Sequence, residues 1–297
     1  MTEGRPSFTA ITAAVMRAAH LLLDQEPLLL RDDLALPLSG VGDEMGLQAA
    51  LAAFRADAMR RLGAELAEAV FHALRGLMVM RSRYTEDALA EARQRGVAQY
   101  VMLGAGLDSF VYRRRDLIDQ LHVFEVDHPA TQRWKRSRLA TLAVDTPANL
   151  TFVPIDFETQ SLMACLGAHG YRAAAPAFFS WLGVTQYLTA AAMTQMLRDV
   201  AIAANGSELV FEYSVTAANL DEMARRILHF ACESNAARGE PWLTLFTPAA
   251  LAAQVQALGF AVVRDVGSAE AFDRYFAQRS DGLRSVPTTH LMHVCLS

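Results

Sequence analysis

Two glycines, Gly104 and Gly106, stand directly after an apolar run in the stretch QYVMLGAGLDSFVYRR, residues 99–114. Glycine lets backbone N–H groups approach a ligand closely, because it has no Cβ in the way. Gly104-Ala105-Gly106 therefore predicts a ligand-binding turn between a strand and a helix; relief of backbone strain is the alternative. The third glycine of the dinucleotide fingerprint would fall at Ser109 and is absent, which disfavours pyrophosphate binding.

Carboxylates follow at the ends of the next two apolar runs. The stretch HVFEVDHPA carries Glu125 and Asp127, and Asp127 is closer to the run's end. The two carboxylate oxygens of Asp127 suit the two hydroxyls of a ribose. The alternative is that Asp127 caps the helix that begins at Pro129. The stretch FVPIDFE places Asp156 and Phe157 at the same edge, where a carboxylate and an aromatic ring suit an adenine. Taken alone, Asp156 fits an ordinary loop residue equally well.

These residues need a sheet that brings the ends of several strands together. From residue 97, short runs rich in Val, Phe, Leu and Tyr alternate with helical segments, which is typical of a parallel sheet with helices on both faces. The fold class is therefore α/β and doubly wound. We expect seven strands, at residues 98–104, 121–127, 150–156, 176–182, 208–215, 260–266 and 290–296.

The N-terminal part has a different pattern. Apolar residues recur at helical spacing through residues 1–95, which predicts a helical cover, followed by a ligand-binding domain over residues 96–297. Thr85 is expected to cap the last helix of this cover, and Gly96 to end it. Residues 216–246 are longer than a plain crossover and are expected to form a lid over the carboxyl edge of the sheet.

Composition excludes several classes of function. The net charge is -5 over 297 residues and the basic residues form no stripe, so no nucleic-acid partner is expected. No run reaches the roughly 18 apolar residues of a membrane helix, and the first residues do not resemble a signal peptide. We therefore expect a cytoplasmic protein without a membrane partner. Three scattered cysteines form no C-x-x-C pair, and no metal is predicted.

Six motifs in register extend over nearly the whole chain: SFTAITAAVMRAAH, MVMRSRYTEDAL, QYVMLGAGLDSFVYRR, FEVDHPATQRWKRSRL, FVPIDFE and FFSWLGVTQYLT. In these motifs the chain resembles the leucine carboxyl methyltransferase-like group of class I S-adenosylmethionine-dependent methyltransferases, in particular its bacterial branch. The resemblance implies a Rossmann-like sheet of seven strands with the last one antiparallel. It also implies that S-adenosyl-L-methionine binds at the carboxyl edge.

The resemblance further implies roles at single positions. Arg81 matches an arginine that reaches the cofactor carboxylate, an anion that suits a guanidinium fork; a solvated arginine beside Arg83 is the alternative. Asp108 matches a position that fixes the glycine turn or approaches the cofactor amine. The other implied cofactor contacts are the methionine part for Gly104, Ala105 and Gly106, the ribose for Asp127, and the adenine for Asp156 and Phe157.

One position departs from the family pattern: Leu182 stands where many members carry a glutamate. Trp181 and Tyr187 flank it, and for both core packing is favoured over a role as a substrate platform. No catalytic residue is assigned, because no spacing singles out one of the conceivable bases, His20, His128, Tyr187, Tyr213 and His229.

The expected reaction is an in-line methyl transfer, for which the protein must hold the acceptor close to the methyl carbon. We expect O-methylation of a carboxyl or hydroxyl group on a hydrophobic small molecule of the secondary-metabolite type. A carboxylate would need no base, whereas a phenol or alcohol would benefit from one. C- or N-methylation and a non-catalytic cofactor-binding protein are the alternatives. The sequence specifies neither the acceptor nor the oligomeric state.

Overall fold

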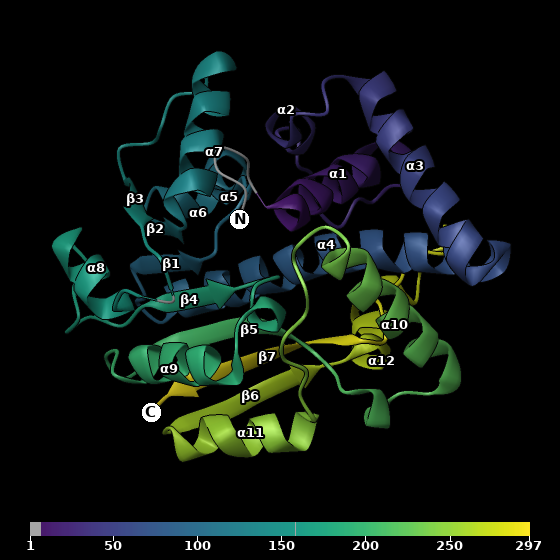
Figure 1. Ribbon diagram of the computed structural model, residues 1–297. Coiled ribbons are helices and arrows are strands. Elements are labelled where there is room, and N and C mark those ends of the chain that lie inside the picture. The colour runs from purple at the N-terminus through teal and green to yellow at the C-terminus, as the bar shows by residue number, and fades with distance from the viewer. Residues whose placement is uncertain (1–6, 158) are drawn as a thin grey trace.

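A single sheet of seven strands organises the molecule (Figure 1). The computed structural model describes residues 7–157 and 159–297, so residues 1–6 of the expected cover lie outside the described residues. The strands follow the order β3-β2-β1-β4-β5-β7-β6, and β7 runs antiparallel to both of its neighbours. Their bounds are β1 (Gln99–Leu103), β2 (His122–Asp127), β3 (Leu150–Pro154), β4 (Phe178–Trp181), β5 (Glu208–Ser214), β6 (Phe260–Val266) and β7 (Thr289–Leu296).

All seven expected strands are confirmed. Every residue of β1, β4 and β5 is buried, because helices cover both faces of the sheet. Strands buried on both faces have continuous apolar runs instead of alternating patterns. These strands can therefore be predicted from the continuous apolar runs in the sequence.

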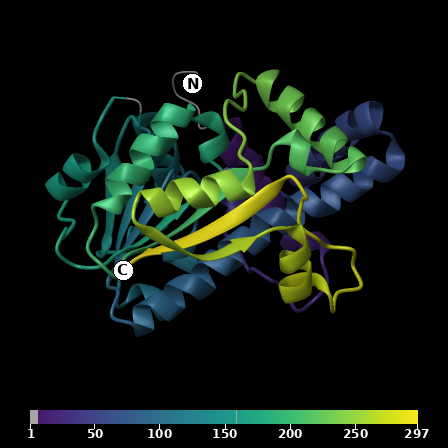
Figure 2. The ribbon, with the colours of Figure 1, turned by 90° about the horizontal axis from the view of Figure 1, so that it is seen from below.

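Helices cover the two faces of the sheet and extend beyond one end of it (Figures 1 and 2). One apolar cluster joins α1 and α4 to one face, and a second joins α8, α9 and α11 to the other. The helices are α1 (Phe8–Leu23), α2 (Ala35–Ser39), α3 (Glu44–Leu62), α4 (Ala64–Gln94), α5 (Phe110–Arg113), α6 (Arg115–Ile118), α7 (Pro129–Thr141), α8 (Leu162–Ala168), α9 (Ala190–Ala201), α10 (Glu222–Ala236), α11 (Pro248–Ala257) and α12 (Ser268–Ala271).

The expected helix start at Thr85 is wrong, because α4 runs without interruption from Ala64 to Gln94. The Thr85 hydroxyl donates to the Arg81 carbonyl at 2.8 Å, a bond that a threonine inside a helix can make to the preceding turn. Glu86 is buried and pairs with Arg113 and Arg114, so it serves tertiary packing instead of a first helical turn. The expected stop at Gly96, which has a φ of 98°, agrees with the end of α4.

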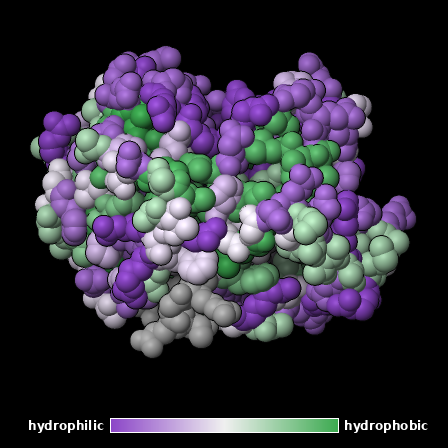
Figure 3. Space-filling view, turned by 90° about the horizontal axis from the view of Figure 1, so that it is seen from above, coloured by the Kyte–Doolittle hydropathy of each residue, from purple (hydrophilic) through white to green (hydrophobic). Residues whose placement is uncertain are grey.

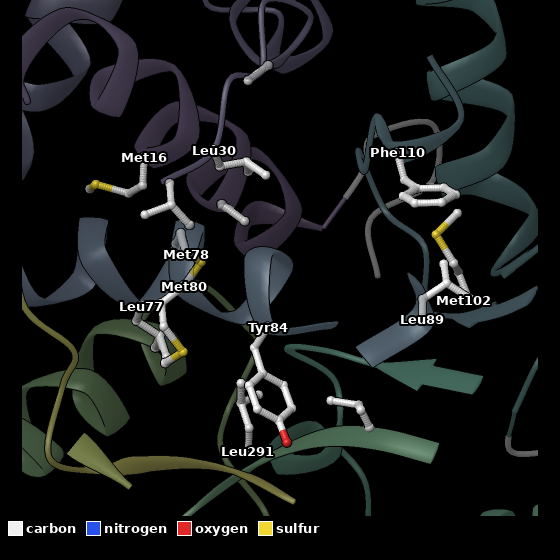
Figure 4. Close-up of a cluster of buried hydrophobic side chains, with 14 of the residues drawn as sticks. Met16, Leu30, Leu77, Met78, Met80, Tyr84, Leu89, Met102, Phe110 and Leu291 are labelled. Carbon is white, nitrogen blue, oxygen red and sulfur yellow. The ribbon is translucent and has the colours of Figure 1, made fainter. Parts of the chain in front are cut away.

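The apolar core fixes the segment that follows β1. Met102 near the end of β1 and Phe110 at the start of α5 are both buried, and their side chains face each other (Figure 4). The intervening turn is thereby held at both ends. The glycine stretch predicted from the sequence is that turn.

The outer surface carries both hydrophilic and apolar side chains. Figure 3 shows hydrophilic side chains over much of one face, with apolar ones gathered in hollows between them. Within residues 7–157 and 159–297, no helix has both the length and the apolar character needed to cross a membrane.

Candidate functional site

The glycine turn adopts a backbone conformation that favours glycine. Gly104 and Gly106 have φ values of 69° and 52°. The N–H groups of Gly104 and Ala105 donate to the Val126 carbonyl at 2.8 and 3.2 Å, which ties the turn to the end of β2. A Cβ on Gly104 would collide with the Val184 side chain, so this glycine is required by the protein's own packing.

Asp127 closes the turn from β2. One carboxylate oxygen accepts from Gly106 N at 2.5 Å and the other from His128 N at 2.6 Å. Burial raises the pKa of Asp127, and these two N–H donors act in the opposite direction. The cap of α7 is His128, whose Nδ1 accepts from Ala130 N at 3.2 Å. The alternative role of Asp127 as the cap is therefore wrong.

Glu125 is buried in the protein and forms an ion pair with Lys135. Its Oε2 lies 2.6 Å from Lys135 Nζ, and both side chains are 1% exposed. Burial raises the pKa of Glu125, while the Lys135 ammonium opposes this shift. Of the two carboxylates on β2, Asp127 is the one that lines a cavity.

A first cavity of about 420 Å³ opens at the carboxyl edge of β1, β2 and β4. It brings together most of the residues predicted from the sequence: Arg81, Gly104, Ala105, Gly106, Asp108, Asp127 and Phe157. Asp156 is not among its lining residues. The Asp156 carbonyl accepts from Thr159 N and Gln160 N at 3.1 and 3.0 Å, so this residue begins a turn.

Arg81 is buried, so the alternative of a solvated arginine is wrong. Its Nη1 donates to Glu212 Oε2 at 2.7 Å, and the side chains are 8% and 4% exposed. Gly183, with a φ of 69°, leaves room for this guanidinium, because a Cβ there would lie 2.9 Å from Nη1. Asp108 Oδ1 accepts from Phe110 N at 2.6 Å, a contact between the segment after the glycine turn and the start of α5.

The sequence did not reveal a contact between the N-terminus of α1 and the loop after α10. The Glu240 carboxylate accepts from Phe8 N at 2.9 Å, from Thr9 N at 3.1 Å and from the Thr9 hydroxyl. A carboxylate is favourable at this end of a helix. Thr9 and Glu240 both line the first cavity. The residues lie 231 positions apart, so no local pattern could have indicated the contact.

A buried ion pair supports the glycine turn from behind. Arg17 Nε donates to Asp32 Oδ2 at 2.8 Å, and its Nη2 donates to the Leu107 carbonyl at 2.7 Å. Asp32 also accepts from the Ser109 hydroxyl at 2.6 Å. Burial acts to raise the pKa of Asp32, but Arg17 and Arg113 outweigh it and lower the pKa.

The lining of the first cavity has an excess of negative charge. The carboxylates of Asp108, Asp127 and Glu240 line it. Its two arginines, Arg17 and Arg81, are each paired with a carboxylate from outside the lining. The cavity therefore favours a ligand that carries positive charge and disfavours a pyrophosphate.

A second cavity of about 440 Å³ lies beside the first and is lined by residues of α1, α3, α4 and α10. Figure 1 shows the arrangement of these four helices. Its walls are mainly apolar, with side chains such as Met16, Leu77 and Phe230. The two cavities share four lining residues, Thr9, Ala13, Arg81 and Tyr187.

The aromatic residues that flank Leu182 have different positions. Trp181 is fully buried in the core, as expected. Tyr187 instead lies in the wall between the two cavities, and its hydroxyl is 3.0 Å from the Thr9 hydroxyl. Leu182 lines the first cavity with an apolar side chain.

Comparison with known proteins gives matches over most of the chain. A family model described as leucine carboxyl methyltransferase matches residues 10–201. The Bacillus subtilis (strain 168) protein named "Putative S-adenosyl-L-methionine-dependent methyltransferase YktD" is 33% identical over 215 residues, which are 72% of this chain and 70% of that protein. A Mycobacterium sp. (strain JLS) protein, "Putative S-adenosyl-L-methionine-dependent methyltransferase", is 34% identical over 150 residues, so the match spans about half of each chain.

A solved structure shares the fold. The crystal structure of "a putative methyltransferase from Thermobifida fusca YX" superposes with a TM-score of 0.60 at 16% identity, covering 99% of this chain and 96% of that one. At this level of identity the similarity concerns the fold alone.

Proposed function

The chain belongs to the leucine carboxyl methyltransferase family and is an S-adenosyl-L-methionine-dependent methyltransferase, and we propose that its first cavity holds the cofactor and its second an apolar small-molecule acceptor. The observation that carries this proposal is the shared wall: an acidic cavity at the glycine turn adjoins an apolar one. Methyl transfer requires two ligands with their reactive atoms in contact. Two adjoining cavities meet this requirement.

The residues of the first cavity fit the cofactor. Asp127 would accept from the ribose hydroxyls, and Phe157 would cover the adenine. Gly104 and Gly106 line the cavity and would lie against the methionine part. Arg81 would bind the cofactor carboxylate with the part of its guanidinium that Glu212 does not use. The predicted contact of Asp156 with the adenine rests on the family motif.

When bound, the cofactor supplies an electrophilic methyl group on a positively charged sulfur. The carboxylates of Asp108, Asp127 and Glu240 favour this positive charge. The same carboxylates disfavour the pyrophosphate of a nicotinamide cofactor. This charge distribution supports a methyltransferase over an oxidoreductase.

We further propose that residues 1–95 and 216–246 cover the acceptor. Side chains of α1, α3, α4 and α10 line the second cavity, and the loop after α10 reaches the first through Glu240. The apolar walls favour a hydrophobic acceptor, for which we propose methylation on oxygen. C- or N-methylation would use the same two cavities.

Calorimetric titration with S-adenosylhomocysteine tests the cofactor assignment, with NADH as the comparison ligand. We expect S-adenosylhomocysteine to bind with one site per chain and NADH to give no heat. Transfer of a labelled methyl group to any acceptor would then exclude a non-catalytic protein. Binding of NADH alone, or of neither ligand, would contradict the assignment of the first cavity.

A further inference from the structure

The wall between the two cavities contains a chain of hydrogen bonds with a defined direction. Tyr187 Oη lies 3.0 Å from Thr9 Oγ1, and the Thr9 hydroxyl donates to Glu240 Oε2. An ionised carboxylate can only accept, so the Thr9 proton points at Glu240. Thr9 Oγ1 must then accept the Tyr187 proton. The Tyr187 hydroxyl thus donates towards Thr9 and accepts with its lone pairs. Trp242 and Gln186 lie beside this oxygen, and a ligand donor in the cavity would share it with them.

Glu240 fixes this direction because three groups of α1 donate to its carboxylate. Both of its oxygens accept backbone N–H groups, from Phe8 at 2.9 Å and Thr9 at 3.1 Å, in the first turn of α1. Three donors and the positive end of a helix stabilise the negative charge.

Two further polar atoms of the second cavity lie on side chains next to the Tyr187 hydroxyl and form no hydrogen bond of normal geometry with the described residues. Gln186 is 4% exposed, and its Oε1 makes no hydrogen bond. The Nε1 atom of Trp242 is also buried and also makes no hydrogen bond. Both residues line the second cavity with Tyr187. Buried polar groups are rarely left without partners, so these atoms indicate a polar group on the ligand.

The second cavity has no free buried cation for an anionic ligand. Among its described lining residues, Arg81 is the one buried cation. It is paired with Glu212, and the rest of its guanidinium is assigned to the cofactor carboxylate in the proposed function. Arg238 is exposed and lies over the Phe8 ring at 4.4 Å. A carboxylate placed among these apolar walls would lose its hydration without gaining a counter-ion.

We propose that the second cavity takes an apolar acceptor with a neutral hydroxyl group, which donates to Tyr187 and is deprotonated through Thr9 and Glu240. The inference rests on the proposed function and narrows its acceptor class from carboxyl or hydroxyl to hydroxyl.

The acceptor proton would leave along the same chain of hydrogen bonds. The acceptor O–H bond breaks and its proton passes to Tyr187 Oη, while the Tyr187 proton passes to Thr9 Oγ1 and the Thr9 proton to Glu240 Oε2. The lone pair left on the acceptor oxygen forms the bond to the methyl carbon, and the sulfur keeps the electron pair of the bond that breaks. Glu240 is half-buried at the edge of the first cavity, from which it returns the proton to solvent.

The test compares two probes that share one ring system, 2-naphthol and 2-naphthoic acid. Each is titrated calorimetrically at pH 7 into protein saturated with S-adenosylhomocysteine. We expect 2-naphthol to bind at least about tenfold more tightly than the carboxylate. Tyr187→Phe and, separately, Thr9→Val should weaken 2-naphthol binding about five- to tenfold, which corresponds to the loss of one hydrogen bond.

Thr12→Val is the matched control. Thr12 also lines the second cavity from α1. Its hydroxyl donates to the Phe8 carbonyl at 3.0 Å and takes no part in the hydrogen bonds from Tyr187 through Thr9 to Glu240. Equal or tighter binding of the naphthoate, no binding of either probe, or the same loss in Thr12→Val would overturn the inference. S-adenosylhomocysteine binding is measured in the same samples, so failure of the proposed function would be seen separately as failure to bind it.

Discussion

Replacement of Asp127 by asparagine should separate ligand binding from folding. In the folded protein the carboxylate accepts two backbone N–H groups, from Gly106 and His128. Burial nevertheless raises its pKa, so the fold disfavours the charged form relative to the unfolded chain. Asp127→Asn removes this unfavourable charge but also one acceptor. These two effects offset each other, and we expect a change in unfolding free energy within about 1 kcal/mol.

The effect on cofactor binding should be larger. Two ribose hydroxyls would donate to the carboxylate, and loss of a charged acceptor costs about 1–3 kcal/mol. This corresponds to about a 5- to 150-fold weaker affinity for S-adenosylhomocysteine. Because the bound ligand favours the charged form, affinity in the wild type should fall as the pH is lowered through the raised pKa of Asp127. The variant should show a flatter dependence.

The assay is calorimetric titration with S-adenosylhomocysteine at several pH values, combined with urea unfolding of the same samples. Asp221→Asn is the matched control, because Asp221 also accepts a backbone N–H, from Ala224 at 2.7 Å, but lies outside both cavities. An affinity of Asp127→Asn within twofold of the wild type would refute the assignment of Asp127 to the ribose. An equal loss in Asp221→Asn would show that the effect is not specific to the site.

Two further predictions concern stability. Gly76→Ala should destabilise the protein by about 1–3 kcal/mol although alanine favours helices, because the added Cβ would overlap the Arg284 carbonyl oxygen. Gly167→Ala, in α8 with nothing within 4 Å, should instead stabilise by about 0.5–1 kcal/mol; thermal unfolding of both variants checks the opposite signs. Burial acts to raise the pKa of Asp281, but hydrogen bonds, first that from Arg279, lower it to about 2. Its stabilisation, about 1–2 kcal/mol above pH 4, should be lost as the pH falls towards 2, so urea midpoints of the wild type and Asp281→Asn should converge there.

The sequence predicted the sheet and the glycine turn because both depend on local chemistry. Strands that are buried on both faces have apolar runs, and the left-handed Gly104 and Gly106 are residues that such a turn requires. The position of Asp127 at the same edge of the sheet as the glycine turn followed from parallel strands that end there, and the structure adds its hydrogen bond with Gly106.

The errors and omissions have a common physical cause. Thr85 followed by acidic residues has the same local pattern at a helix start and inside a helix, and here packing of Glu86 against two arginines decides for the interior. The Arg81–Glu212 and Thr9–Glu240 contacts join residues 131 and 231 positions apart. Such partners are selected by tertiary packing, so spacing along the chain carries no signal of them.

The uninterrupted α4 has a consequence for the range of molecules that the protein can accept. It forms one wall of the second cavity. Through Glu86 it also forms ion pairs with Arg113 and Arg114, which follow the glycine turn in the sequence. This wall therefore keeps a fixed distance from the glycine turn. The opposite walls are α3 and α10. The C-terminal part of α3 and part of α10 pack with the first turns of α4 in a small apolar cluster beside the two main cores. Tolerance for bulkier acceptors should accordingly come from displacement of the parts of α3 and α10 in this small cluster, while α4 keeps its packing against the glycine turn.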